Sequence, residues 1–396
     1  SNYAVFVNRR RSVPDIKDGL KIVHRRIIYA AFNDEKAFNN HNVKSASIVG
    51  TVLKKYHPHG DTAVYDSIKP MNNWFEIMLP LFDGKGNWGN FQGDGAAAMR
   101  YTETKLSEFA YECVIGDLKD AKNAVTWIPN FDGTCLEPEY LPAKIPLLLI
   151  NGSFGIGVGL LTQIPKHNIN EVIDATLHLM KHPNAEITLI PDQCMPCEIV
   201  DTDWDNISRT GKGKFTVRGI IEVSNYKGNP ALIIKSTPDL VFLDNVTEKI
   251  DALIKDKKLP QIIDMIDDSD PDNMRFIIVL KKGSDPNFLR DIIYKNTLME
   301  KSVSVNFEAL DGIEPMRLSY KGYLQLFLSH TKEVKFRKYS NKLQYYKTRL
   351  HEKDAYIKAL ESGKIDQVIS MIRKSKKTDE QYLVNYLIKT LKITDL

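Results

Sequence analysis

Apolar positions in the first part of the chain recur at the spacing of short helices. Between residues 44 and 56 they fall every three or four positions, which predicts a helix with one apolar face. Residues 57–60 break this helix, and Asp61 can cap a second one. Two helices joined by a four-residue turn that contains glycine predict a helix-turn-helix, although many helical pairs bind nothing. The apolar faces consist of Ala46, Val49, Val52, Leu53 and Tyr56, and then of Val64, Ile68 and Met71.

Residues 146 to about 320 alternate between β-rich and helical stretches. This order predicts a small α+β layer of the split βαβ kind, in a ferredoxin-like part over about residues 212–310. The expected strands are 215–223, 231–236, 275–280 and 302–307, and the expected helices are 247–257 and 287–296.

From about residue 321 the pattern becomes strongly helical. Seven apolar side chains follow a 3-4 heptad rhythm over about 28 residues, with only Lys353 out of place. Such a stripe predicts a long coiled-coil arm and favours a lever or a dimer contact. It consists of Phe336, Tyr339, Leu343, Tyr346, Leu350, Ile357 and Leu360. We therefore expect a multidomain chain of mixed α/β and α+β class, divided at residues 1–145, 146–320 and 321–396.

Composition places the chain among soluble globular proteins, with 43% hydrophobic and 26% charged residues. No apolar run approaches the roughly 20 residues of a membrane span, and the first residues lack the apolar core of a signal peptide. The first residue is not Met, so we expect the chain to start inside a longer parent protein. Four cysteines in 396 residues make no disulfide scaffold and favour reduced thiols in a cytoplasmic protein.

The formal charge of +4 is unevenly distributed. Residues 1–60 contain eleven Lys and Arg against four Asp and Glu, a local charge of +7, so the rest sums to −3. Basic clusters are usually solvated faces. Here the excess includes residues 9–11 and 25–26, close to the helical signals, which favours a polyanionic partner and above all nucleic acid. A helix-turn-helix commonly places its second helix in a major groove.

Four patterns suggest metal or nucleotide sites, and each has a plainer interpretation. Cys194 and Cys197 have CxxC spacing but no second pair to complete a zinc site. Residues 268–272 resemble the start of an EF-hand without its glycine and its closing glutamate. Residues 84–89 fit GxGxxG but run into a second loop rather than a helix, which favours a glycine-rich loop beside an active site. His57 and His59 could bind a metal, but at the corner of a helix-turn-helix they more plausibly donate hydrogen bonds to an anion.

The sharpest segment is 96–103, in which small residues precede Arg100, Tyr101, Thr102 and Glu103. Any of the seventeen tyrosines is by default a packing residue. This segment, however, resembles the active-site segment of the A subunits of bacterial type IIA DNA topoisomerases, the family of DNA gyrase and topoisomerase IV. Dense matching covers about residues 3–175. Further motifs follow in the family's order and spacing at 11–21, 24–26, 55–61, 86–87, 129–134, 144–146, 151–153 and 155–156.

The resemblance implies a winged-helix cleavage domain at residues 1–145, a tower domain at 146–320 and a coiled-coil arm at 321–396 that leads toward a dimer gate. It implies that Tyr101 is the nucleophile that becomes covalently joined to DNA. A phenol with a pKa of about 10 is a poor nucleophile when neutral and needs help. The resemblance assigns this help to Arg100, which favours the phenolate, and to Arg11, His57 and His59, which complete a clamp on the phosphate.

The same resemblance implies contacts that position the DNA. Ile156 is by residue type a buried strand residue, but the matching isoleucine of the family wedges between base pairs and bends the duplex. Thr62 and Asp66 match the positions that contact quinolones, the first of which is commonly serine. The expected contacts to flanking phosphates are Lys21, His24, Arg25, Arg26 and Lys44.

No carboxylate cluster for a divalent metal and no P-loop stand out in the sequence, so we expect no cofactor and no metal in this chain. The resemblance places Mg²⁺ and ATP on a partner B subunit, in an A2B2 assembly built around a homodimer of this chain. It implies double-stranded DNA as partner, no membrane, and a location in the bacterial cytoplasm with the nucleoid. The family's N-terminal arm, dimer gate and DNA-wrapping domain are not in the sequence, so we expect no strand passage from this chain alone.

Two rival interpretations remain, a non-catalytic DNA-binding protein and a coiled-coil scaffold. Neither needs a nucleophile, so the Arg100–Tyr101 pair together with His57 and His59 discriminates against both.

Overall fold

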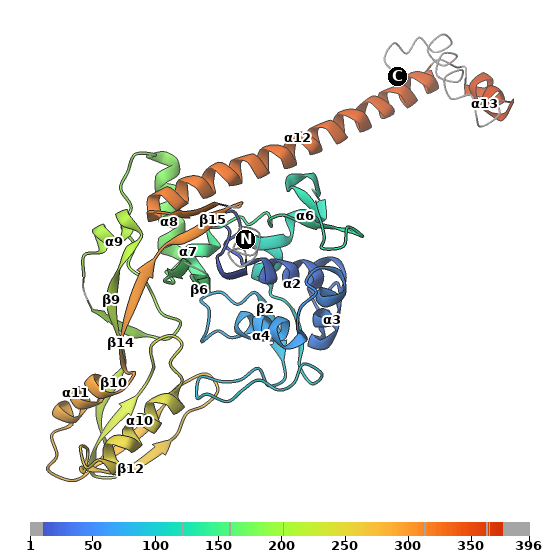
Figure 1. The fold of residues 1–396 in the computed structure, drawn as a ribbon. Helices are drawn as coiled ribbons and strands as arrows, with labels where there is room; N and C mark the ends of the chain where they lie inside the picture. The colour runs from blue at the N-terminus through green and yellow to red at the C-terminus, as the bar shows by residue number, and fades with distance from the viewer. Residues whose placement is uncertain are drawn as a thin grey trace. The chain divides into compact units, whose positions relative to one another are not determined.

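The computed structural model describes residues 11–120, 122–157, 160–200, 202–312, 314–361, 363 and 365–374. The expectations for Arg9 and Arg10, and for the end of the arm beyond residue 374, lie outside these ranges. The chain forms two compact units, Ser1–Val334 and Lys335–Leu396, and each is described by itself. The fold mixes helices with antiparallel sheets (Figure 1). None of the described helices is both long enough and apolar enough to cross a bilayer.

Three helices form the start of the first unit, namely α2 (Ile22–Asn33), α3 (Ser45–Lys55) and α4 (Asp61–Asn72). The predicted helix pair is confirmed, and its apolar faces pack into one core, except that Leu53 is only partly buried and Ala46 lies outside the core. Ile48, which the spacing left out, is also fully buried. Helix α4 begins at Asp61 itself, with Gly60 in the capping position that we had expected for Asp61.

A small sheet completes this region in the order β1-β3-β2, formed by β1 (Val43–Lys44), β2 (Phe82–Lys85) and β3 (Glu103–Leu106). Both pairings are antiparallel. Strand β2 runs into a loop and not into a helix, as the interpretation of residues 84–89 required. The short elements that follow are α5 (Glu108–Ala110), η1 (Tyr111–Ile115), α6 (Asp117–Asp120), η2 (Lys122–Ala124), β4 (Trp127–Pro129), β5 (Leu136–Pro138) and α7 (Leu147–Asn151).

A five-stranded antiparallel sheet in the order β6-β7-β14-β9-β8 forms the next layer. Its strands are β6 (Ser153–Gly157), β7 (Leu160–Ile164), β8 (Cys197–Val200), β9 (Lys212–Gly219) and β14 (Glu300–Asn306). It shares a core with α8 (Ile169–Lys181), α9 (Trp204–Thr210) and the first turns of α12 (Tyr320–Glu361). A separate hairpin joins β15 (Glu308–Asp311) to β16 (Glu314–Arg317).

The predicted split βαβ arrangement is present but smaller than expected. A four-stranded sheet in the order β10-β11-β13-β12 places β13 between β11 and β12, which helix α10 connects. Its elements are β10 (Ile221–Tyr226), β11 (Asn229–Ile234), α10 (Leu243–Lys255), β12 (Ile262–Asp267), β13 (Phe276–Leu280) and α11 (Pro286–Asn296). The range 212–310 was therefore too wide, because β9 and β14 pair with each other in the five-stranded sheet. For the same reason the single strand predicted at 215–223 divides into β9 and β10.

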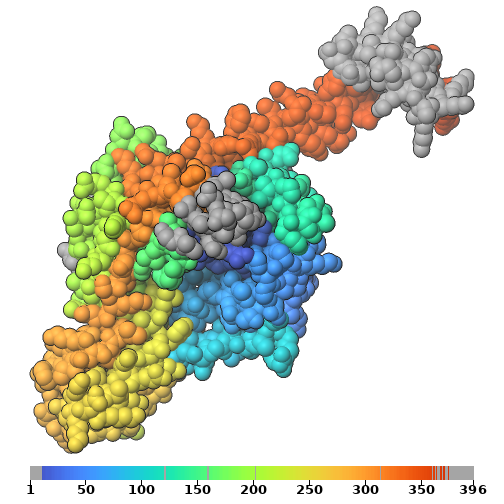
Figure 2. All heavy atoms as spheres, in the orientation of Figure 1, coloured from blue at the N-terminus to red at the C-terminus, as the bar shows by residue number. Residues whose placement is uncertain are grey.

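In the space-filling view, residues of the four-stranded sheet and its helices gather in a lobe of their own, which the loop after β2 reaches (Figure 2). Phe91 of that loop is buried in the apolar core of this lobe. The loop backbone also accepts N–H groups from the start of α10, where Leu243 N–H donates to the Phe91 carbonyl at 3.0 Å. The glycine-rich loop is therefore anchored on the lobe.

Helix α12 (Tyr320–Glu361) confirms the long helix predicted after residue 321, and α13 (Ile365–Lys374) follows it. In the second unit the seven side chains of the heptad stripe are all exposed. An exposed stripe of this kind is what a coiled coil would cover with a second helix, so the coiled coil itself stays a prediction.

Candidate functional site

Tyr101 lies at the surface, with 63% of its area exposed, at the end of the loop that leads into β3. The guanidinium carbon of Arg100 lies 4.6 Å from the centre of the Tyr101 ring. A guanidinium over a phenol ring stabilises the pair by cation–π attraction and puts a permanent positive charge over the ring. The structure therefore brings together the two residues that the sequence singled out first.

Buried hydroxyl groups fix the backbone around Tyr101. Thr102 Oγ1 lies 2.8 Å from Ser45 Oγ and 2.9 Å from Tyr65 Oη, and Tyr65 also donates to the Ala97 carbonyl at 2.7 Å. The Ser45 N–H donates to the Thr102 carbonyl at 3.1 Å. These bonds connect the segment before and after Tyr101 to α3 and α4, so an exposed side chain stands on a rigid base.

His57 and His59 form a second cluster at the far end of α3. Their rings meet edge to face with centroids 4.4 Å apart. Arg11 Nη2 lies 2.5 Å from His59 Nε2, and Arg26 Nη1 lies 3.0 Å from His57 Nδ1. Burial, reinforced by the charges of Arg26, His59 and Arg11, lowers the pKa of His57 to about 4. Burial and the two arginines also lower the pKa of His59, so both histidines are neutral at physiological pH.

The expected single cluster of nucleophile and phosphate clamp does not form within one chain. Thr102, next to Tyr101, is bonded to the first residue of α3, whereas His57 follows the last turn. Helix α3 has 11 residues and therefore a length of about 16 Å. The segment of Tyr101 is thus bonded to the start of this helix, and His57 follows its end, about one helix length away.

Arg25 and Arg26, two of the predicted phosphate contacts, each form an ion pair with a carboxylate of the same chain. Arg25 is 5% exposed and binds both carboxylate oxygens of Asp18, at 2.6 and 2.9 Å. Arg26 binds both oxygens of Glu137 in the same way, at 2.8 and 2.6 Å. A buried carboxylate that lost its arginine would be left uncompensated, so both ion pairs hold the interior of the protein together.

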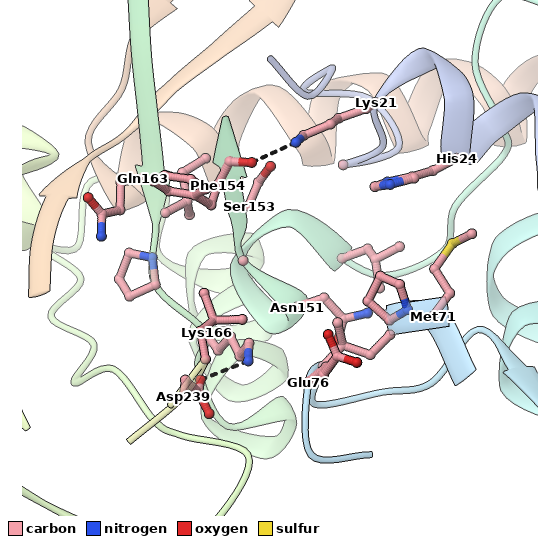
Figure 3. A pocket seen from close by; sticks show the side chains of 18 of the residues that line it. Lys21, His24, Met71, Glu76, Asn151, Ser153, Phe154, Gln163, Lys166 and Asp239 are labelled. Carbon is pink, nitrogen blue, oxygen red and sulfur yellow. Dashed lines mark hydrogen bonds and ion pairs between the residues drawn. The ribbon is translucent and has the colours of Figure 1, made fainter. Parts of the chain in front are cut away.

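Lys21 and His24 line a cavity of about 460 Å³ between the helical region and the five-stranded sheet. Figure 3 shows them along one wall, opposite the ion pair of Lys166 and Asp239. Lys21 Nζ donates to the Phe154 carbonyl at 2.6 Å, and burial lowers its pKa. Burial, with the charges of Lys21 and Arg25, lowers the pKa of His24 to about 3, so His24 offers a neutral N–H.

Ile156 is 70% exposed on strand β6, in a hairpin with β7. The interpretation as a strand residue is therefore confirmed, but the burial that it implied is wrong. Next to it Gly155 meets the backbone of Ser12, where an added Cβ would lie 1.8 Å from the carbonyl oxygen. Glycine here lets the hairpin lie directly against the chain before α2, while the isoleucine side chain points outward.

The remaining predicted residues lie at the surface of the helix pair and its sheet. Thr62 and Asp66 are exposed on α4, where Asp66 pairs with Lys69 at 2.6 Å. Lys44 pairs with Glu103 of the neighbouring strand at 2.8 Å, and both side chains remain partly exposed. An exposed pair of this kind is weak and can open to a phosphate.

The patterns that suggested metal sites have other contacts. Cys194 Sγ accepts from Lys166 Nζ at 3.0 Å, and burial raises the pKa of Cys194 and of Cys197 to about 12. Asp270 accepts the N–H groups of Asp272 and Asn273, which makes residues 268–273 an acidic turn. Within the described ranges, no group of three or more His, Cys, Asp and Glu side chains could hold a metal ion.

Sequence reasoning missed Glu137, Ser45 and Tyr65. Glu137 is 3% exposed and pairs with Arg26, which lies 111 residues away in the chain. Ser45 and Tyr65 occupy helical positions where a hydroxyl gives no signal of its own. Only contacts between distant segments reveal these residues.

The site thus defines a class of protein in which an exposed tyrosine lies beside an arginine. The segment of this tyrosine is fixed to a pair of helices, which also carry arginine and histidine side chains. The family of the A subunits of DNA gyrase and topoisomerase IV matches residues 11–395, and the chain belongs to this family.

Several DNA gyrase A subunits are similar over nearly the whole chain. The one from Buchnera aphidicola subsp. Acyrthosiphon pisum is 40% identical over 385 residues, which are 94% of this chain and 46% of that protein. The one from Pseudomonas aeruginosa is 39% identical over 384 residues, 94% of this chain and 41% of that protein. The one from Helicobacter pylori is 37% identical, over 94% of this chain and 45% of that protein. The chain spans somewhat less than half the length of these relatives.

Proposed function

We propose that this chain is the DNA-cleaving and rejoining part of a type IIA topoisomerase A subunit, with Tyr101 as the nucleophile. The observation that carries the proposal is the exposed Tyr101 with Arg100 against its ring, on a segment fixed to two helices, in a chain of this family. A tyrosine with a structural role would be buried with its hydroxyl bonded.

The proposed chemistry keeps the energy of the phosphodiester. The Tyr101 oxygen attacks the phosphorus, an O–P bond to tyrosine forms, and the bond from phosphorus to a deoxyribose oxygen breaks. The phenol proton leaves, and the departing DNA oxygen takes up a proton. The resulting DNA hydroxyl later reverses the step and reseals the strand. Arg100 supplies the charge that favours the phenolate and holds the phosphate.

We propose that the phosphate clamp comes from a second copy of the chain. Within one chain, helix α3, which is about 16 Å long, separates the segment of the nucleophile from the cluster of Arg11, His57 and His59. In a homodimer with twofold symmetry, the Tyr101 end of one protomer can face the histidine end of its partner. Two identical sites then cut the two strands of one duplex.

The proposal extends to the DNA. The exposed face of α4 with Thr62 and Asp66 would enter a groove, and these two positions would meet quinolones. Lys21, His24 and Lys44 would bind phosphates, and Ile156 would wedge between base pairs. In this assignment the helix pair with its sheet is the winged helix, the two larger sheets form the tower, and α12 begins the coiled-coil arm. Mg²⁺ and ATP would be bound by a B subunit in an A2B2 assembly in the bacterial cytoplasm.

The test of the nucleophile is a trapped covalent adduct. The chain is incubated with a B subunit, duplex DNA and Mg²⁺, and then denatured. We expect DNA-linked protein from the natural chain and at least a thousandfold less from Tyr101→Phe, because no other residue can form the ester. Tyr111→Phe, on another tyrosine of the same region, is the matched control and should give normal adduct. An adduct that survives Tyr101→Phe contradicts the assignment.

The shared site is tested with mixed dimers. One protomer carries Tyr101→Phe, and its partner carries Arg11→Ala with His59→Ala. If the clamp comes from the partner, one of the two sites is intact and single-strand cleavage reappears. If each site uses one chain only, both sites are defective and the mixed dimer is as inactive as its parents.

A further inference from the structure

Glu137 lies in strand β5 and is almost fully buried. Its two carboxylate oxygens accept from Arg26, with Nε to Oε2 at 2.8 Å and Nη2 to Oε1 at 2.6 Å. Two parallel bonds to one carboxylate fix the plane of a guanidinium as well as its position. The orientation of Arg26 is therefore set by Glu137.

The third nitrogen of this guanidinium points at His57. Arg26 Nη1 lies 3.0 Å from His57 Nδ1. A guanidinium has donors but no acceptor, so Nδ1 must offer a lone pair. A neutral imidazole has one proton, and with Nδ1 as acceptor that proton belongs to Nε2.

His59 shows the opposite arrangement. Arg11 Nη2 lies 2.5 Å from His59 Nε2, so by the same reasoning the proton of His59 belongs to Nδ1. The two rings are in contact, edge to face. Two neighbouring histidines are thus held in different tautomers by two different arginines, and among the contacts of the described residues only the arginine of His57 is itself held by a carboxylate.

We propose that Glu137 is a positioning residue that acts through Arg26 to hold His57 in its neutral form with the proton on Nε2, ready to donate a hydrogen bond to an oxygen of the DNA phosphate. The phosphate as acceptor rests on the proposed function, whereas the tautomer rests only on the contacts of Glu137, Arg26 and His57. Arg26 is then an orienting group and not a phosphate ligand.

The tautomer matters because the phosphate is an anion. With the proton on Nε2 an imidazole donates to it, whereas with the proton on Nδ1 the same ring turns a lone pair toward negative charge. Because the pKa of His57 is low, the ring does not take up a second proton at neutral pH, and only the tautomer decides whether Nε2 can donate. A fixed neutral donor, which needs no reorientation when charge develops, is the kind of group that stabilises such a transition state.

The tautomer is measured by NMR of the whole chain with labelled histidine, without DNA. The His57 signals are assigned by their loss in His57→Asn. We expect a single form protonated at Nε2 in the natural chain and a mixture of both tautomers in Glu137→Gln. The glutamine amide has one acceptor oxygen and can no longer accept from both Nε and Nη2 of Arg26. Glu300→Gln removes the carboxylate of another arginine pair, that of Arg218, and should leave the His57 signals unchanged.

Glu137→Gln leaves a buried arginine without its charge partner and can impair folding. The double variant Arg26→Met with Glu137→Leu removes both charges and fills the space with apolar side chains, a replacement that proteins often tolerate. In this variant we also expect mixed tautomers, with a His57 pKa that moves up toward the ordinary value of about 6.5.

The functional arm measures covalent adduct in a single turnover, with a B subunit, DNA and Mg²⁺. Either variant should slow adduct formation by about tenfold to a hundredfold, less than removal of a direct oxyanion donor, while DNA affinity changes little. A His57 that keeps its Nε2 proton in the folded double variant overturns the positioning role. Mixed tautomers with an unchanged rate overturn donation to the phosphate. Mixed tautomers with no adduct even from the natural chain support the positioning role and reject the proposed function.

Discussion

Ile156 and Tyr101 are among the most exposed large side chains of the first unit. Each lies on a segment of backbone that contacts with other parts of the chain hold in place. Gly155 and Gly157 flank Ile156 and bring no side chain of their own, and the other apolar side chains exposed on this hairpin are Phe154 and Leu161. The backbone at Gly155 is pressed against Ser12. An apolar side chain with a rigid base and open surroundings is suited to insertion between bases, where unstacking costs a few kcal/mol.

At this scale we predict that Ile156→Ala reduces DNA bending. Fluorescence transfer between the ends of a labelled duplex should report a clearly smaller bend, because the truncated side chain no longer separates a base step. DNA affinity should stay governed by salt, since phosphate contacts are untouched. Leu177→Ala, which removes a similarly exposed side chain from α8, is the control. An unchanged bend in Ile156→Ala would rule out the wedge.

Helix α3 is the element that sets the geometry of the site. Its first residue is bonded to the nucleophile segment, and its last turn leads into the histidines. The bonds from Thr102 to Ser45 and Tyr65 join α3, α4 and the start of β3 at one point. Any movement of the two helices is therefore passed directly to Tyr101.

We predict that Tyr65→Phe lowers stability modestly and cleavage more strongly. Loss of the hydroxyl removes its bonds to Ala97 and Thr102, which together contribute about 1–3 kcal/mol to the free energy of unfolding. It also loosens the segment that holds Tyr101, so the rate of adduct formation should fall by about tenfold.

Tyr56→Phe is the matched control, because Tyr56 is also buried and donates to Asp34 at 2.7 Å, away from the nucleophile segment. Urea unfolding should show a comparable loss of stability in both variants, and the single-turnover rate should fall only in Tyr65→Phe. Equal rates in the two variants would mean that the hydroxyl bonds serve stability alone.

For the first unit as a whole, buried histidines dominate the expected response to acid. Burial lowers the pKa of His24 to about 3 and the pKa values of His57 and His167 to about 4. An unfolded chain protonates these side chains near pH 6.5, whereas the folded chain does not until about pH 4. Stability is therefore fully present above pH 6.5 and falls as the pH drops toward 4.

Asp15 opposes this trend over part of the range. Burial raises its pKa to about 6, so between pH 6 and about 4 the folded chain holds a proton that the unfolded chain does not, and this group gains stability as the pH falls. Three histidines and one aspartate act in opposite directions, so below pH 6 the unfolded chain binds roughly two more protons than the folded chain. Each of these protons lowers the free energy of unfolding by about 1.4 kcal/mol for every pH unit by which the pH falls.

Urea unfolding of the chain at several pH values between 7 and 4.5 measures this slope. In His167→Gln the free energy of unfolding should fall less steeply with pH, by about 1.4 kcal/mol per pH unit or one proton, because the residue at 167 no longer titrates. A free energy of unfolding that is constant across this range would contradict the neutral, buried state of the histidines.

Periodicity and motif order were enough for much of this protein. The helix pair, the long helix after residue 321, the split βαβ order and the segment around Tyr101 all depend on neighbours in sequence, which share a helix face or a turn. They could therefore be predicted before any fold was known. The family, too, follows from ordered motifs over the first 175 residues.

What the sequence could not decide are contacts between segments far apart in the chain. Strand β9 belongs with β14, about 90 residues later, and this pairing moved the boundary of the smaller sheet. Arg25 and Arg26 are both basic residues in a basic run, and only burial beside Asp18 and Glu137 shows that their charges are matched inside the protein. Tyr101 and His57 belong to the same set of motifs, yet the segment of one is bonded to the start of α3 and the other follows its end, with a helix of about 16 Å between. Charge pairing and distance are properties of the packed chain, because they depend on which surfaces burial brings together.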